Sequence, residues 1–185
     1  IATRSCIFGQ YHKFVYEARL LYYLQTLQIS TSYLKCQAIF FIQLIKFCEN
    51  MTKKVVIAGS ASLQEKVLYW KKFWENQGHC VTDYPVPINK ENFLEEYPKV
   101  HTDFFKNIME ADILFVMNED KNDIAGYLGA ESFAEMCFGV AQNLIHNKNL
   151  EVLLLQEPSE RVQSYEEIVL WLKLGWIKLH DKNIA

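Results

Sequence analysis

From residue 54 onward, short apolar runs alternate with longer stretches of helical periodicity. The apolar runs predict five strands, at Lys54–Ala58, Cys80–Tyr84, Ile113–Met117, Val152–Leu155 and Trp176–Leu179. Between them, apolar residues recur every three or four positions, which predicts helices over residues 63–77, 101–111, 130–143 and 164–174. Gly78 and Gly175 follow the first and last of these helices, as is typical of helix ends.

This alternation of strands and helices predicts βαβ units, and therefore a parallel sheet with right-handed crossovers. The strands are continuously apolar, which indicates that both faces of the sheet are buried. We expect an α/β fold with a doubly wound, five-stranded parallel sheet of flavodoxin-like order 2-1-3-4-5. That order places a switch point between the first and third strands, so residues 59–62 and 118–129 would line one crevice at the carboxyl edge of the sheet.

Residues 1–50 differ in composition from the rest of the chain. They contain five Lys or Arg, two acids and no proline, whereas residues 51–185 contain fourteen Lys or Arg, twenty acids and all four prolines. Leucines at positions 20, 21, 24 and 27 predict an amphipathic helix. We expect residues 1–50 to be an N-terminal extension, helical or non-essential, and residues 51–185 to be the functional α/β domain.

Charge and cysteine content narrow the class of protein. The net charge is -3 and the Lys and Arg residues are scattered, which gives no indication of a nucleic-acid polymer as partner. The five cysteines form no CxxC pair and no ligand-like spacing with histidine, which predicts a reducing, cytoplasmic compartment and no metal site. The apolar stretch 38–47 is interrupted by Gln43 and Lys46 and falls short of the roughly 18 residues that span a bilayer, so we expect no membrane partner.

The segment between the third strand and the next helix, Gly126-Tyr-Leu-Gly-Ala-Glu-Ser-Phe-Ala-Glu135, is the most informative part of the sequence. Gly126 and Gly129 permit tight turns and a close approach of backbone to a ligand. Glu131 and Glu135 follow where the helix should begin, beside the expected crevice. Two interpretations remain open, because Glu135 either faces a ligand or completes a capping box with Ser132 that satisfies backbone N–H groups at the helix start.

Three segments resemble the nucleoside 2-deoxyribosyltransferase family, including its relatives that hydrolyse deoxynucleotide N-glycosidic bonds. Val55-Val-Ile-Ala-Gly-Ser60 is similar to the opening strand and Gly-Ser loop of that family. Ala111-Asp-Ile-Leu-Phe-Val116 is similar to the strand before its active-site loop, and Tyr127–Met136 resembles its loop-to-helix segment. The resemblance covers roughly residues 54–155 and none of the first fifty.

The resemblance implies roles for individual residues. Glu135 aligns with the family nucleophile, Ser132 with a hydroxyl position, and Glu131 with a variable position. Asp103 matches a substrate-side aspartate only with a gap of one residue, and would orient the sugar or Glu135. The expected substrate-binding residues are Gly59, Ser60, Asn118, Asp123, Gly129, Glu131 and Ser132.

The chain also departs from the family pattern. Gly129 stands where the best-known members carry an aspartate, and the nearest upstream loop acid is Asp123. The opening strand lacks a tyrosine that many members use to shape the pocket. Cys137 and Gly139 replace a glycine and an alanine. These departures affect the expected activity more than the expected fold.

The implied chemistry is attack by the Glu135 carboxylate on the anomeric carbon of a 2-deoxynucleoside or its 5′-monophosphate, without a cofactor. A covalent glycosyl-enzyme forms, and an acceptor base or water then resolves it. Asp123 or Asn118 would contact base or sugar, and Ser60 with backbone N–H groups near helix starts would hold a 5′-hydroxyl or 5′-phosphate. Relatives of the family assemble as oligomers, so the resemblance also implies a homo-oligomer.

Several alternatives remain open from the sequence. Asp103 could only solvate its helix, Asp123 could be a turn residue, and Ser60 could be a helix cap. Glu131 is either a second acid of the site or a surface charge. The same crevice could bind a nucleotide-derived ligand as a sensor without turnover, or Trp171, Trp176 and residues 1–50 could form a surface for a protein partner.

Overall fold

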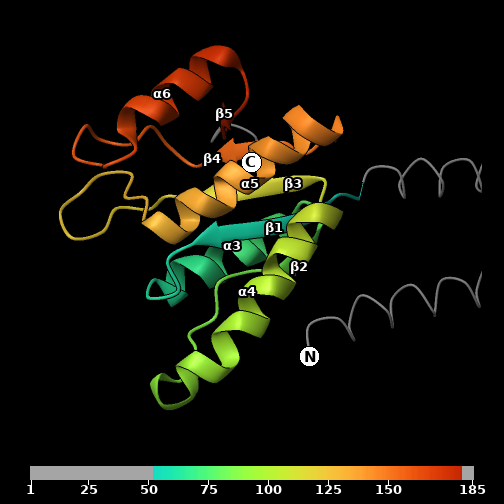
Figure 1. Ribbon diagram of the computed structural model, residues 1–185, viewed down its shortest axis with the longest axis vertical. Coiled ribbons are helices and arrows are strands. Elements are labelled where there is room, and N and C mark those ends of the chain that lie inside the picture. The colour runs from blue at the N-terminus through green and yellow to red at the C-terminus, as the bar shows by residue number, and fades with distance from the viewer. Residues whose placement is uncertain (1–51, 181–185) are drawn as a thin grey trace, which may run out of the picture. The chain divides into compact units, whose positions relative to one another are not determined.

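A parallel sheet of five strands forms the centre of the part of the chain that the computed structural model describes, residues 52–180 (Figure 1). The strands are β1 (Lys54–Gly59), β2 (Cys80–Asp83), β3 (Ile113–Met117), β4 (Glu151–Leu154) and β5 (Lys178–Leu179). Their spatial order is β2-β1-β3-β4-β5, and every neighbouring pair is parallel. The predicted α/β class and strand order are therefore confirmed.

Helices cover both faces of this sheet (Figure 1). They are α3 (Gln64–Asn76), α4 (Phe93–Glu110), α5 (Ala130–His146) and α6 (Tyr165–Leu174), with a short 3-10 helix η1 (Lys90–Asn92) before α4. Buried residues of α3 pack on one face, and those of α4, α5 and α6 pack on the other. The inner strands β1, β3 and β4 are therefore screened from water on both sides, which explains their mainly apolar sequences.

Successive side chains of β1 point to opposite faces of the sheet and so belong to two separate parts of the core. Val55 and Ile57 face the α3 side, whereas Val56 and Ala58 face the α4 and α5 side, and all four are fully buried. On the α3 side, the indole of Trp70 lies against Phe115, with 5.0 Å between ring centroids. The indole N–H of Trp70 donates a 2.7 Å hydrogen bond to Glu119 Oε1, just beyond the end of β3.

Helix α4 begins eight residues earlier than the sequence predicts, at Phe93 and not at His101. Pro98 lies inside the helix, where it has no N–H to offer the carbonyl of Leu94. Leu94 is 89% exposed in the first turn, so water can satisfy that carbonyl and the helix tolerates the proline. As a result Tyr97 and His101, four residues apart, lie on one helical face.

Helix α5 begins at Ala130 with Gly129 as its N-cap, and no side chain makes a capping hydrogen bond. The capping-box interpretation of Ser132 and Glu135 is therefore wrong, because both residues lie inside the helix. Gly139 brings α5 close to the sheet, since a Cβ at that position would lie 2.6 Å from Leu114 Cδ2.

The expectations for residues 1–50 lie outside the described residues and stay predictions. The chain divides into two units between Thr52 and Lys53, and the second unit holds the fold described here. Among the helices of residues 52–180, none combines the length and the apolar character needed to cross a bilayer.

Candidate functional site

A cavity of about 350 Å³ opens at the carboxyl ends of β1 and β2, between α4 and α5. Its volume lies in the range of small-molecule sites, which is roughly 300–1,000 Å³. The titratable residues that line it are Asp83 from β2, Tyr84 directly after β2, Tyr97 and His101 from α4, and Glu131 and Glu135 from α5. This place, at the carboxyl edge of a doubly wound sheet, is where such folds bind their ligands.

Glu135 is the most deeply buried acid of this cavity, with 6% of its surface exposed. It lies in the second turn of α5, and its carboxyl makes no hydrogen bond or ion pair with any residue of the described part. Burial, together with the negative charges of Glu131 and Asp83, raises its pKa from 4.5 to about 8. The carboxyl is therefore mostly protonated at neutral pH while the cavity holds no ligand.

Asp83 at the end of β2 is a second acid of the cavity that the sequence analysis missed. Its carboxylate accepts hydrogen bonds from Asn107 Nδ2 at 2.7 Å and from the Tyr84 backbone N–H at 2.8 Å. Burial raises its pKa, although these two hydrogen bonds oppose the shift. Its position in the sequence could have indicated this role, because an acid at the carboxyl end of a parallel strand lies at the edge of the sheet where such folds bind ligands.

Tyr97 and His101 form the α4 side of the cavity. Their rings stack nearly parallel, with centroids 5.0 Å apart, and Phe93 stacks on Tyr97 at the same distance. His101 Nδ1 lies 3.6 Å from Glu131 Oε1. Burial raises the pKa of the Tyr97 hydroxyl, and its hydrogen bond to Glu131 raises it further. Sequence reasoning missed Tyr97 because it placed the start of α4 too late.

Asp103 lies on α4 but does not line the cavity. Its carboxylate pairs with Lys99 and Lys106 on the same helix, and the hydrogen bond from Lys99 lowers its pKa. The structure therefore does not bring Asp103 to Glu135, and it favours the interpretation of Asp103 as a solvated helix residue. Asp83, and not Asp103, lines the cavity together with Glu135.

Glu131 stands in the first turn of α5 and lines the same cavity as Glu135, four residues further on. Its side chain is 57% exposed, so it lies at the rim while Glu135 lies inside. The structure thus brings the two acids together on one helical face, as their spacing predicts.

Gly59, the last residue of β1, lines the cavity, and Ser60 follows it in the loop after β1. The hydroxyl of Ser60 accepts a 2.8 Å hydrogen bond from Lys121 Nζ and lies 3.0 Å from the hydroxyl of Ser62. Helix α3 has Leu63 as its N-cap, without a side-chain cap, so the alternative of Ser60 as a helix cap is wrong. The loops after β1 and β3 thus meet, as the strand order predicts.

Asn118 and Asp123 both lie in the loop after β3. Asn118 is fully buried and donates from Nδ2 to the carbonyls of Gly126 and Gln156, while its Oδ1 accepts from the Gln156 N–H. Asp123 is exposed, has a φ of 57°, and accepts a hydrogen bond from Arg161 at its backbone carbonyl. Neither lines the cavity, so the structure favours structural roles for both.

Gly129 and Ser132 lie near the start of α5 but also outside the cavity wall. Gly129 lines a separate hollow of about 420 Å³ next to Phe133 and Glu167. Ser132 is buried, with 5% of its surface exposed. Of the substrate-binding residues expected from the sequence, Gly59 and Glu131 are therefore the ones that line the cavity with Glu135.

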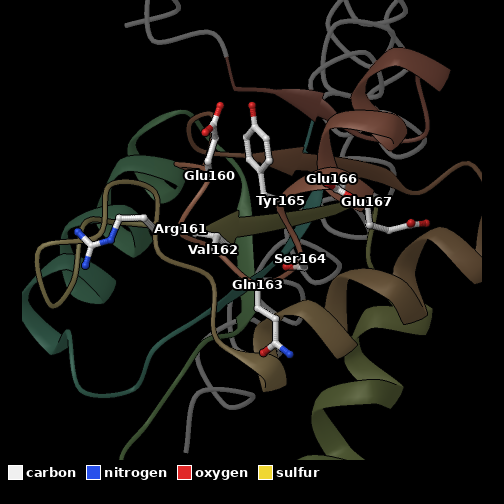
Figure 2. A pocket seen from close by; sticks show the side chains of 8 residues that line it. All are labelled: Glu160, Arg161, Val162, Gln163, Ser164, Tyr165, Glu166 and Glu167. Carbon is white, nitrogen blue, oxygen red and sulfur yellow. The ribbon is translucent and has the colours of Figure 1, made fainter.

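A larger hollow of about 720 Å³ lies along residues 160–167, before and within the start of α6 (Figure 2). Its lining comes from one continuous segment. Figure 2 shows the side chains of Arg161, Gln163 and Glu167 pointing in different directions, not towards a common point. Volume alone does not make a site, and this hollow lacks the convergent polar groups that orient a ligand.

The sequence matches no protein-family model, and a search of curated proteins gives no match. The resemblance to nucleoside 2-deoxyribosyltransferases thus rests on the three sequence segments alone. That cavity combines three acids, a histidine and an aromatic wall, and no Lys or Arg is among the described residues that line it. Such a site suits acid–base or nucleophilic chemistry on an uncharged or cationic ligand.

Proposed function

We propose that the chain cleaves or transfers at the N-glycosidic bond of 2-deoxynucleosides, with Glu135 as the nucleophile. One observation carries the proposal. A carboxyl that no described residue pairs lies in the wall of an open cavity at the ligand edge of the sheet. A group in that place is poorly explained by stability, because burying an unpaired carboxyl destabilises the fold.

In the proposed reaction the ionised form of Glu135 is the nucleophile, and an oxygen of its carboxylate bonds to the anomeric carbon as the bond from that carbon to the base nitrogen breaks. The base leaves with the electron pair and takes a proton. Water or a second base then attacks the same carbon, displaces Glu135 and gives hydrolysis or transfer. Asp83, whose pKa burial also raises, is the acid that we assign to protonating the leaving base.

The lining of the cavity favours an uncharged nucleoside over its 5′-monophosphate. Three acids face the cavity without a Lys or Arg among its described lining residues, so a phosphate there would meet like charge. The rings of Phe93 and Tyr97 offer a flat apolar surface for a base. A 5′-phosphate would need Lys121, which is bound to Ser60 beside Gly59.

The test is to incubate the protein with 2′-deoxynucleosides, with and without a second free base, and to separate the products by chromatography. We expect released or exchanged base from the wild type and none from Glu135→Ala. Glu110→Ala is the matched control, because Glu110 is an exposed acid at the end of α4. A Glu135→Ala protein that turns over like the wild type would refute the mechanism.

The second candidate function is binding of a nucleotide-derived ligand without turnover. It is favoured by the raised pKa of Glu135, which leaves little carboxylate at neutral pH, and by the position of Asp103 away from the cavity. A sensor of this kind would be stabilised against heat by a deoxynucleoside while releasing no base. Base release would decide for the enzyme.

A further inference from the structure

The cavity contains a second group of side chains, which shares Glu135 with the proposed reaction and adds His101 and Glu131. His101 of α4 and Glu131 and Glu135 of α5 each present one nitrogen or oxygen atom, and these three atoms all lie within 4.8 Å of one another. Within this set, His101 Nδ1 and Glu131 Oε1 are 3.6 Å apart. Two helices that pack side by side thus point three metal-ligand groups at one point in the cavity.

Glu135, the buried member of this set, is the residue that a bound cation would stabilise most. Glu135 is 6% exposed, lines the cavity, and has no hydrogen bond or ion pair with any residue in 52–180. Asp83 adds a further acid to the same wall, and no Lys or Arg among the described residues lines it. A buried carboxyl keeps its proton, is paired with a cation or coordinates a metal, and the described part of the chain supplies no such cation.

The ligand types define the class of ion. One imidazole and two carboxylates suit Zn²⁺ and its neighbours among the transition metals, whereas Mg²⁺ and Ca²⁺ prefer sites made of oxygen alone. At bond lengths of roughly 2.0–2.2 Å, tetrahedral ligand atoms stand about 3.3–3.6 Å apart. A pair at the 4.8 Å limit must therefore close by about 1.2–1.5 Å. Glu131 is 57% exposed and can turn towards the ion without disturbing the core.

We propose that His101, Glu131 and Glu135 bind one divalent transition-metal ion of the Zn²⁺ class. Three protein ligands leave a fourth position open towards the cavity, where water or a small ligand coordinates. This site goes beyond the proposed function and does not depend on it. An ion bound there occupies the oxygen that would attack the sugar, so Zn²⁺ inhibits any glycosidic activity of Glu135.

The test uses the full-length protein, stripped of metal with a chelator that is then removed. Zn²⁺ is titrated by calorimetry, and Co²⁺ is titrated by visible absorption, which reports the geometry around the ion. We expect one Zn²⁺ per chain and an affinity lowered at least about tenfold in His101→Ala, Glu131→Gln and Glu135→Gln, since even loss of a group that only orients a ligand costs that much. His146→Ala, which removes an exposed histidine at the end of α5, should bind like the wild type.

The variants keep the experiment decisive if one of them fails to fold. Glu131 is at the surface, so Glu131→Gln is expected to fold, and circular dichroism checks each protein before titration. The proposal is overturned if the wild type binds no Zn²⁺ at micromolar concentration, or if Glu131→Gln and His101→Ala bind it as tightly as the wild type. Neither result bears on base release, which is measured without added metal.

Discussion

At the scale of single residues, the buried carboxyl of Glu135 links folding to pH. Its pKa is about 8 in the folded chain and near 4.5 when unfolded. Between these values the folded chain keeps a proton that the unfolded chain has released. Stability therefore falls as pH rises through this window, and the total effect is on the order of a few kcal/mol.

Glu135→Gln should remove this dependence, because the amide does not ionise. We expect the free energy of unfolding of the wild type to drop relative to the variant between about pH 5 and pH 8. Urea denaturation of both proteins at each pH, with a chelator present, measures the difference. Curves that stay parallel across this range would show that Glu135 titrates normally.

Gly126 carries a second prediction at this scale. Its φ is 59°, and a Cβ there would lie 2.7 Å from the Glu157 carbonyl oxygen and 2.8 Å from Pro158 Cα. Gly126→Ala therefore combines left-handed strain with a clash against backbone. Gly175→Ala is the control, because Gly175 has a φ of 71° and a Cβ there would meet nothing within 4 Å.

We expect Gly175→Ala to cost about 1 kcal/mol from strain alone, and Gly126→Ala to cost about 1–3 kcal/mol more. Thermal or urea unfolding of the two variants gives the comparison. Equal losses would mean that the loop around Gly126 moves aside at no cost.

At the scale of elements, the position where α4 begins determines which aromatic side chains line the cavity. Its extension back to Phe93 puts Tyr97 on the cavity wall next to His101. The extension runs through Pro98, which leaves one helical hydrogen bond unmade.

Replacing Pro98 with Ala should restore that hydrogen bond and raise stability by about 1–3 kcal/mol. Were Pro98 in a loop before the helix, the same change would be neutral or would destabilise by up to about 1 kcal/mol through the unfolded chain. Thermal unfolding, with helix content followed by circular dichroism, separates the two outcomes.

The sequence predicted the elements better than it predicted their ends. A continuously apolar strand such as Ile113–Met117 indicates by its composition that it is buried on both faces. The fold class and the strand order could therefore be predicted from the apolar pattern and the rules for connections between strands. The start of α4 was predicted eight residues too late. The helix continues back through Pro98, which is tolerated because Leu94 is exposed, and that exposure is a property of the folded chain.

The site was predictable only where loop position determined it. Glu135 and Glu131 follow the third strand, so their place at the ligand edge could be read from the chain. Asp83 reaches the cavity because β2 pairs beside β1. Asp103 lies two residues after His101 on α4 and so on a different helical face, where it pairs with Lys99 and Lys106. A single sequence gives no clear signal of the contacts between segments far apart along the chain, or of the rotamers that neighbouring side chains adopt.

At the scale of the whole molecule, residues 51–185 should fold without the first fifty. Within residues 52–180, the buried apolar residues between Val55 and Ile177 cover both faces of the sheet, so this part of the chain has a core of its own. A chain truncated to residues 51–185 is expected to be soluble, to unfold cooperatively and to keep the α/β circular-dichroism signature. Insolubility or loss of that signature would place the domain boundary elsewhere.

Assembly belongs to this scale as well. The resemblance implies a homo-oligomer, and light scattering coupled to gel filtration measures the mass of the full-length protein in solution. A mass above one chain is the expected result, and a monomer of 21.7 kDa would contradict it.

The hydrogen bond from Trp70 to Glu119 joins the helix after β1 to the first turn of the loop after β3. An indole whose N–H is held by a carboxylate emits light differently from one released into water, so this pair is a built-in optical reporter. A ligand that rearranges the mouth of the sheet should change the colour or intensity of this emission, which is read on top of the emission from the three other tryptophans.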